Sequence, residues 1–203
     1  MSQIIISIGR ENGSGGRDIA SRIAEQLHIE MYDAAVLREA VRKINPDIDP
    51  AQLSEFEEAP RKIGLSRKVA GYSNSMEEIL AEVQFDFIKE KAKSGESFVI
   101  VGRCADKMLE EYKCLVKIFV RGDAEKKIKR IALRHGVEEA EAKKIIEKTD
   151  KSRKKYYESY SGGAKWGDSS HYDIVINSSR IGIEQTAKIL VDFIAEADKA
   201  LEN

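Results

Sequence analysis

The chain of 203 residues is long enough to bury a sizeable core, and its 42% hydrophobic and 34% charged residues argue against wholesale disorder. The net charge of -1 hides a local surplus, because residues 121–155 hold thirteen Lys or Arg against seven Asp or Glu. The start, Met1-Ser2-Gln3, has no basic leader, and no apolar run reaches the ~20 residues that span a bilayer. We therefore expect a cytoplasmic protein with anionic partners and no membrane partner, folding alone or as a simple homo-oligomer.

Apolar runs alternate with helical stripes along the chain, and this order predicts an α/β fold with a mainly parallel sheet. Five short apolar runs predict buried strands, at residues 4–8, 29–32, 98–101, 115–120 and 173–176. Apolar residues spaced by three and four predict helices that begin at Arg17, Ala34, about Met76, about Ala124, Glu138 and Ile181.

Two segments interrupt the alternation. Residues 45–96 contain Pro46, Asp49-Pro50 and a Gly/Ser-rich stretch but no strand pattern, so we expect a mostly helical insertion there. Residues 156–172 are rich in Gly, Ser and aromatic side chains and lack periodicity. That composition predicts a mobile loop suited to a lid.

A glycine-rich turn, with Gly9, Gly13, Gly15 and Gly16, joins the first predicted strand to the first helix. Bare backbone lets phosphate approach, and the amides of a helix N-terminus attract anions. Tight packing alone would also explain these glycines. The spacing is shared by short-chain dehydrogenases, in which Asp33 could bind a ribose. That NAD(P)-binding oxidoreductase is the runner-up, because residues 45–96 lack the strand it needs and the chain has no Tyr-x-x-x-Lys pair.

Four blocks of sequence carry a family resemblance. They are Ile8–Arg17, Val101–Asp106, Lys148–Arg153 with Lys165–Asp168, and Tyr172–Asp173 with Ile176–Ser179. In order and spacing they resemble the cytidylate kinase-like family, a divergent bacterial branch of the P-loop nucleoside monophosphate kinases. The resemblance implies one P-loop NTPase-type domain over residues 1–203, with three layers and a five-stranded, mainly parallel sheet. It also implies a monophosphate-binding helical insertion near 45–95 and a lid near 148–170.

The glycine turn departs from the family pattern at its end. A Walker A loop ends in Gly-Lys-Ser/Thr, whereas this turn reads Gly15-Gly16-Arg17-Asp18. Aligned without a gap, Gly16 takes the lysine place; with a shift of one residue, Arg17 takes it and Asp18 stands where the magnesium hydroxyl normally lies. We adopt the shift, because an arginine at a helix start can bridge phosphate oxygens. If Arg17 is structural, another basic residue such as Arg10 has to serve the phosphates.

This alignment assigns the donor site. It implies that Arg17 is catalytic, that Asp18 binds Mg²⁺ and that ATP is bound by Gly13, Ser14, Gly15, Gly16, Arg17 and Asp18.

Two further positions are candidates for binding the acceptor. Gly102-Arg103 resembles the Gly-Arg-Asp after the third core strand of cytidylate kinases, where the arginine contacts the monophosphate. Because the end of a parallel strand faces the ligand crevice, Arg103 is well placed for that role, and a surface ion pair is the alternative. Asp33 follows the second predicted strand, where it could orient the acceptor or cap the next helix.

Asp150-x-x-Arg153 resembles the lid motif in which an aspartate touches the nucleotide and an arginine spans the two phosphates. The spacing of three places both side chains on one helix face. The resemblance implies that Asp150 and Arg153 bind substrate and that Arg153 is catalytic. An exposed ion pair on a charged helix is the alternative.

The resemblance implies ATP-dependent phosphorylation of a nucleoside monophosphate, with CMP or dCMP the first choice and Mg²⁺ as cofactor. The partners are then small-molecule nucleotides. Aromatic residues beside the lysines mimic a nucleic-acid platform, but a sheet core with a glycine turn accounts for more of the sequence, so we expect no nucleic-acid partner. A nucleotide-binding sensor without turnover is a second hypothesis, because the Walker lysine is missing.

Overall fold

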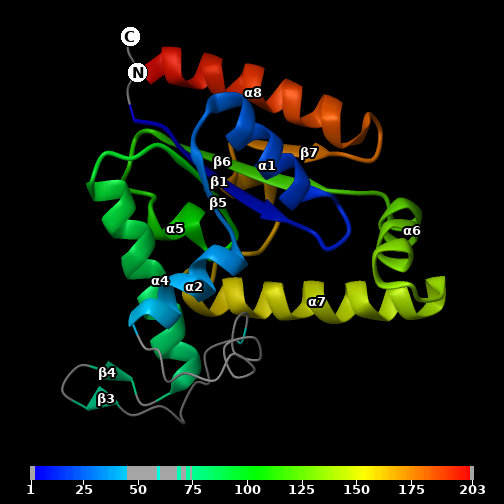
Figure 1. Ribbon diagram of the computed structural model, residues 1–203, viewed down its shortest axis with the longest axis horizontal. Helices are drawn as coiled ribbons and strands as arrows, with labels where there is room; N and C mark the ends of the chain where they lie inside the picture. The colour runs from blue at the N-terminus through cyan, green and yellow to red at the C-terminus, as the bar shows by residue number, and fades with distance from the viewer. Residues whose placement is uncertain (1–2, 45–58, 60–67, 70–71, 74, 202–203) are drawn as a thin grey trace.

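The computed structural model describes residues 3–44, 59, 68–69, 72–73 and 75–201. Five strands form one sheet in the order β2-β5-β1-β6-β7, and every neighbouring pair is parallel (Figure 1). The strands are β1 (Ile5–Arg10), β2 (Glu30–Tyr32), β5 (Phe98–Val101), β6 (Leu115–Arg121) and β7 (Ile174–Asn177). The five predicted strands and the parallel α/β class are thus confirmed.

The order of the strands decides between the two folds that the glycine turn allowed. β1 lies between β5 and β6, and β5 separates it from β2. A dinucleotide-binding sheet sets its second strand directly beside its first. The observed order therefore excludes the oxidoreductase fold.

Strand side chains alternate between two faces, as a period of two requires. Ile6 and Ile8 of β1 pack in one cluster with α1 (Gly16–Leu27) and α8 (Gly182–Leu201). Ile5 packs on the opposite face with residues of α2 (Ala34–Ile44), α4 (Met76–Lys93) and α5 (Ala105–Met108). Helices on both faces of the sheet give the predicted three layers.

The remaining helices lie beside the sheet's carboxyl edge. α6 (Ala124–His135) packs on α7 (Glu139–Tyr160) through Ile131, Ala142 and Ile146. A short 3₁₀ turn, η1 (Ser169–His171), precedes β7. Within the described residues, no helix has both the length and the apolar character to cross a bilayer.

The loop predicted from Tyr156 was wrong at its start, because α7 continues to Tyr160. Tyr156 and Tyr157 are buried in a cluster with Ala81 and Phe85 of α4, and this packing extends the helix where composition favours a loop.

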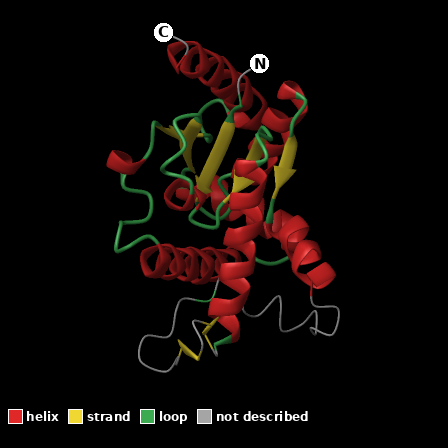
Figure 2. Cartoon of the chain, turned by 90° about the vertical axis from the view of Figure 1, so that its left-hand side faces the viewer, coloured by secondary structure: helices red, strands yellow, loops and turns green. Residues whose placement is uncertain are grey.

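The insertion also differs from expectation, since β3 (Lys68–Val69) and β4 (Tyr72–Ser73) pair antiparallel. Strands of two residues are too short to leave an alternating pattern in the sequence. In both views α4 runs from the sheet toward this hairpin (Figure 1, Figure 2). Much of the rest of the insertion, residues 45–58 and 60–67, lies outside the described residues.

Candidate active site

The glycine turn runs from the end of β1 to Gly16, the first residue of α1. Gly13 (φ +79°) and Gly15 (φ +81°) have left-handed backbone that favours glycine. A Cβ at Gly13 would lie 2.9 Å from the carbonyl oxygen of Lys127 in α6. The turn is therefore packed tightly against α6, and it ends at a helix N-terminus, where amide groups attract anions.

Side chains hold the shape of this turn. Ser14 Oγ donates to the Glu11 carbonyl oxygen at 2.8 Å and accepts from the Gly16 amide at 3.3 Å. The Glu11 carboxylate in turn accepts from the Gly122 amide at 3.0 Å and pairs with Lys127 at 2.9 Å. Both contacts tie the turn to the segment after β6, so its backbone is fixed from two sides.

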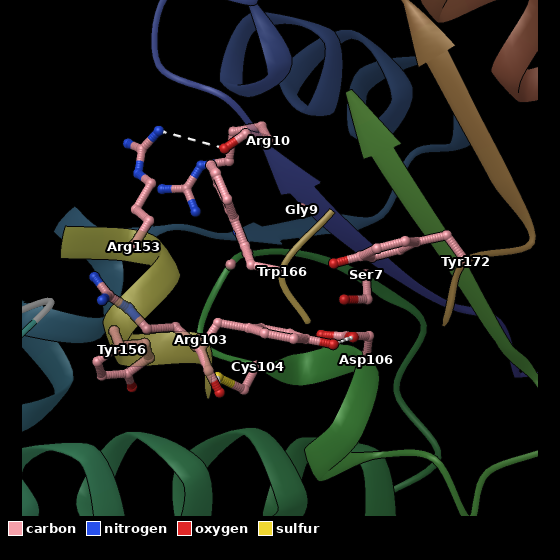
Figure 3. A pocket seen from close by; sticks show the side chains of 12 residues that line it. Ser7, Gly9, Arg10, Arg103, Cys104, Asp106, Arg153, Tyr156, Trp166 and Tyr172 are labelled. Atoms are coloured by element: carbon pink, nitrogen blue, oxygen red, sulfur yellow. Dashed lines mark hydrogen bonds between the residues drawn. The ribbon is translucent and has the colours of Figure 1, made fainter. Parts of the chain in front are cut away.

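Beside the turn lies a pocket into which three arginines project, here called the arginine pocket (Figure 3). Arg10 comes from β1, Arg103 follows β5 and Arg153 comes from α7. The other lining residues are Ser7, Gly9, Gly102, Cys104, Asp106, Tyr156, Tyr157, Trp166 and Tyr172. The pocket is at the carboxyl ends of β1 and β5, the place where open parallel sheets bind ligands.

Arg103 is held in an uncommon backbone conformation. Its φ is +60°, and it stands between Gly102 (φ +79°) and Cys104 (φ +52°). The left-handed region is costly for residues other than glycine and is found disproportionately at binding sites. The turn buries Arg103, with 3% of its surface exposed, in the wall of the pocket. The predicted acceptor residue thus lies in a basic pocket.

Asp106 is the one acid among the described residues that line the pocket. Burial raises the pKa of its carboxyl group, although the Tyr157 hydroxyl, which donates to it at 2.6 Å, acts in the opposite direction. Burial also raises the pKa of Tyr157 and of Tyr172. The pocket is basic because its three arginines outnumber this one carboxyl group.

The two predicted lid residues lie on α7 and contact the glycine turn. Asp150 accepts a hydrogen bond from the Asn12 amide at 2.6 Å, and Arg153 Nη1 lies 3.5 Å from the Arg10 carbonyl oxygen, to which it donates. Arg153 Nη1 lies 3.9 Å from Asp150 Oδ1, so the two side chains share one face of the helix, as their spacing of three predicts. Burial raises the pKa of Asp150, and the Asn12 amide only partly offsets this. α7 thus brings one acidic side chain, Asp150, and one basic side chain, Arg153, to the turn.

Arg17 and Asp33 meet each other instead of the arginine pocket. Arg17 Nε donates to Asp33 at 2.7 Å, and the arginine side chain is 59% exposed. Asp33 also accepts from the amides of Ala35 at 2.9 Å and Val36 at 3.1 Å, so it caps α2. Burial raises the pKa of Asp33, but the Val36 amide and Arg17 outweigh it and the pKa lies below its usual value.

Asp18 lies on the first turn of α1 and pairs with Arg134 of α6 at 3.2 Å. In the part of the chain that the structure describes, no group of three potential ligands surrounds a metal position. Asp18 is thus directed to Arg134, and its assignment as a metal ligand stays a prediction.

Sequence reasoning left the lining of the arginine pocket largely unassigned. Arg10 was a second choice for the phosphates, and Trp166 and Tyr172 were not candidates, yet all three line the pocket. Its position was the available signal for Arg10, since Arg10 is the last residue of the first strand, where the glycine turn begins.

The fold defines the class first: a three-layer α/β protein with a mainly parallel sheet, of the P-loop NTPase type. Shikimate kinase from Bacteroides thetaiotaomicron has the same fold, with a TM-score of 0.55 at 15% identity, covering 95% of this chain and 98% of that chain. The likeness is greater to an uncharacterized protein from Eubacterium ventriosum ATCC 27560, with a TM-score of 0.75, 34% identity and coverage of 95% and 99%.

The chain belongs to the cytidylate kinase-like family, whose model matches residues 5–180. A cytidylate kinase of Pyrobaculum calidifontis is 26% identical over 193 residues, which are 94% of this chain and 92% of that protein. The family implies a kinase-type enzyme that acts on nucleotides or other small molecules.

Proposed function

We propose that this protein transfers the γ-phosphoryl group of ATP to a nucleoside monophosphate, with CMP or dCMP the leading acceptor. One observation carries the proposal: Arg10, Arg103 and Arg153 line one pocket beside a glycine turn. Such a pocket suits the phosphates of two anionic substrates brought together. The choice of CMP or dCMP rests on the family and on relatives named cytidylate kinase.

The geometry supports a different role for the turn, for Arg103 and for Arg153. Phosphates of ATP bind at residues 13–16, where the turn meets the amino end of α1. Arg103 binds the phosphate of the acceptor, because it is buried in the wall of the pocket. Arg153 lies at the border, since it lines the pocket and also contacts the turn, and it stabilises the charge shared between the two substrates.

This reaction needs positioning and charge neutralisation and no covalent nucleophile. Asp150 contributes by fixing α7 on the Asn12 amide, which sets the position of Arg153 one helical turn later. Asp33 contributes by capping α2 at the edge of the acceptor region. Both roles are ones of placement, and neither carboxylate has to accept a proton.

A sensor that binds nucleotide without turnover is the second candidate. Two observations favour it. In the alignment without a gap, Gly16 stands where a Walker A loop has its lysine. The Asp150 carboxylate already accepts a hydrogen bond from the Asn12 amide of the turn. Such a protein would bind ATP but release no ADP.

The test is ADP release from ATP and magnesium in the presence of CMP, dCMP, UMP, AMP or GMP, with shikimate and gluconate as unphosphorylated controls. We expect release with a pyrimidine monophosphate and none with the two controls. ATP binding without release with any monophosphate would favour the sensor. Release with shikimate or gluconate alone would refute a phosphorylated acceptor.

A further inference from the structure

The side chain of Arg10 crosses the position that a Walker lysine would occupy. Gly16 begins α1, and a Cβ placed on it would lie 2.6 Å from Cβ and 3.1 Å from Cγ of Arg10. A real Cβ atom essentially never has a contact as short as 2.6 Å, so Arg10 fills the space next to Gly16. The backbone of Gly16 is not left-handed, since it is absent from the positive-φ glycines. Glycine is therefore required at position 16 for space.

The guanidinium end of Arg10 lies over a second glycine. A Cβ on Gly102 would collide with Arg10 Nη1. Gly102 directly precedes Arg103, so the cation of Arg10 lies between the glycine turn and the acceptor arginine, in the pocket that Arg153 also lines. Gly16 and Gly102 thus leave space for the side chain of Arg10 as it runs from the end of β1 into the arginine pocket.

Arg17 does not share this placement. Its guanidinium pairs with Asp33 at 2.7 Å, and Asp33 is held by the cap of α2. Arg17 is not among the residues that line the arginine pocket. Its charge is therefore partly neutralised and directed away from the pocket.

We propose that Arg10 replaces the Walker lysine as a catalytic residue, binding the γ-phosphoryl group during transfer. The inference rests on the proposed function. In the step, an oxygen of the acceptor phosphate bonds to the γ-phosphorus while the bond to the β,γ-bridging oxygen breaks, and that electron pair leaves with ADP. Arg10 gives up no proton; its fixed charge stabilises the negative charge on the moving group, and its planar fork suits two oxygens at once.

The proposal predicts that positions 10 and 16 are coupled. Any side chain at position 16 has to displace Arg10, so Gly16→Ala should impair turnover although the residue binds no substrate through its side chain. Lysine at position 16 cannot coexist with Arg10 for the same reason. The pair Arg10→Gly with Gly16→Lys removes the colliding Cβ and returns a cation from the ordinary Walker position.

The experiment measures ADP release and, separately, calorimetric binding of ATP for the parent, Arg10→Ala, Arg10→Lys, Gly16→Ala and the Arg10→Gly/Gly16→Lys pair. Arg17→Ala tests the competing arginine, the one that the shifted alignment places at the lysine position, with folding of every variant followed by circular dichroism. We expect Arg10→Ala to lower turnover by about thirtyfold to a thousandfold. Arg10→Lys and the double variant should recover part of it, and Arg17→Ala should lose less turnover than Arg10→Ala.

The outcomes separate this proposal from the proposed function. Parental turnover in a folded Arg10→Ala, with loss in Arg17→Ala, would overturn the role of Arg10 and leave the kinase. If the parent binds ATP without turnover, the kinase fails, but weaker ATP binding in Arg10→Ala still supports Arg10 as the phosphate cation. If Arg10→Ala does not fold, Gly16→Ala decides: unchanged turnover there would overturn the proposal. A parent that binds no ATP would overturn both.

Discussion

Arg103→Ala should weaken the acceptor far more than the donor, because Arg103 is buried at the acceptor end of the arginine pocket. A hydrogen bond to a charged group contributes about 1.5–3 kcal/mol. Loss of that contact corresponds to about tenfold to a hundredfold in the dissociation constant of CMP. ATP affinity should change by less than about threefold, since the donor phosphates bind at the turn.

Calorimetric titrations of CMP and ATP, each alone, measure the two effects separately. Arg103→Lys keeps the charge without the planar fork and should fall between alanine and the parent. Cys104→Ser is the matched control, because Cys104 lines the same pocket with similar left-handed backbone (φ +52°) and carries no cation. Equal losses for CMP and ATP in Arg103→Ala would refute the placement of the acceptor beside Arg103.

Three other predictions concern stability. ATP with magnesium should raise the melting temperature more than NAD does, since a ligand at 100 times its dissociation constant adds about 2.7 kcal/mol. Asp33→Ala should lower stability at pH 7 by about 1 kcal/mol through loss of the cap. That difference should shrink as the pH falls below 3.8, the usual pKa of an aspartate, because the pKa of Asp33 is lowered and its contribution is lost as the pH falls through that lowered value. Asp106→Asn keeps an acceptor for Tyr157 and removes a carboxyl whose pKa burial raises, so its melting temperature relative to the parent should increase as the pH rises above about 4 and then level off. A difference in melting temperature between Asp106→Asn and the parent that is the same at pH 4 and pH 8 would contradict this reasoning.

The sheet could be predicted from sequence because its signals are local. Residues 98–101 are apolar throughout, and the structure buries all four of them as β5. The extension of α7 over Tyr156 and Tyr157 had no such signal, since the packing of these rings on Phe85 depends on residues some 70 positions away in the chain, a contact that no local pattern contains.

The glycine turn could be recognised as a phosphate-type turn, but not the direction of its side chains. Spacing alone left Gly16 and Arg17 both possible at the lysine position. In the structure, contacts with other residues set the directions of the two arginines. Arg17 is hydrogen-bonded to Asp33, and Arg10 packs against Gly16, which has no side chain. Each contact joins residues whose neighbourhood exists only after β1, α1 and β2 have packed. The sequence therefore predicts the region of the candidate site without predicting that Arg10 lines the pocket and Arg17 does not.

The electrostatics of the arginine pocket also argue for an anionic ligand with more than one charge. Arg10, Arg103 and Arg153 contribute three positively charged side chains to one lining, and Asp106 is the one acid among the described lining residues. A phosphate monoester carries about 1.5 to 2 negative charges at pH 7. Shikimate and gluconate carry a single carboxylate each, and would leave more of the pocket's charge uncompensated. The same fold therefore supports kinases of different small molecules, while the charge of this pocket favours an acceptor that is already phosphorylated.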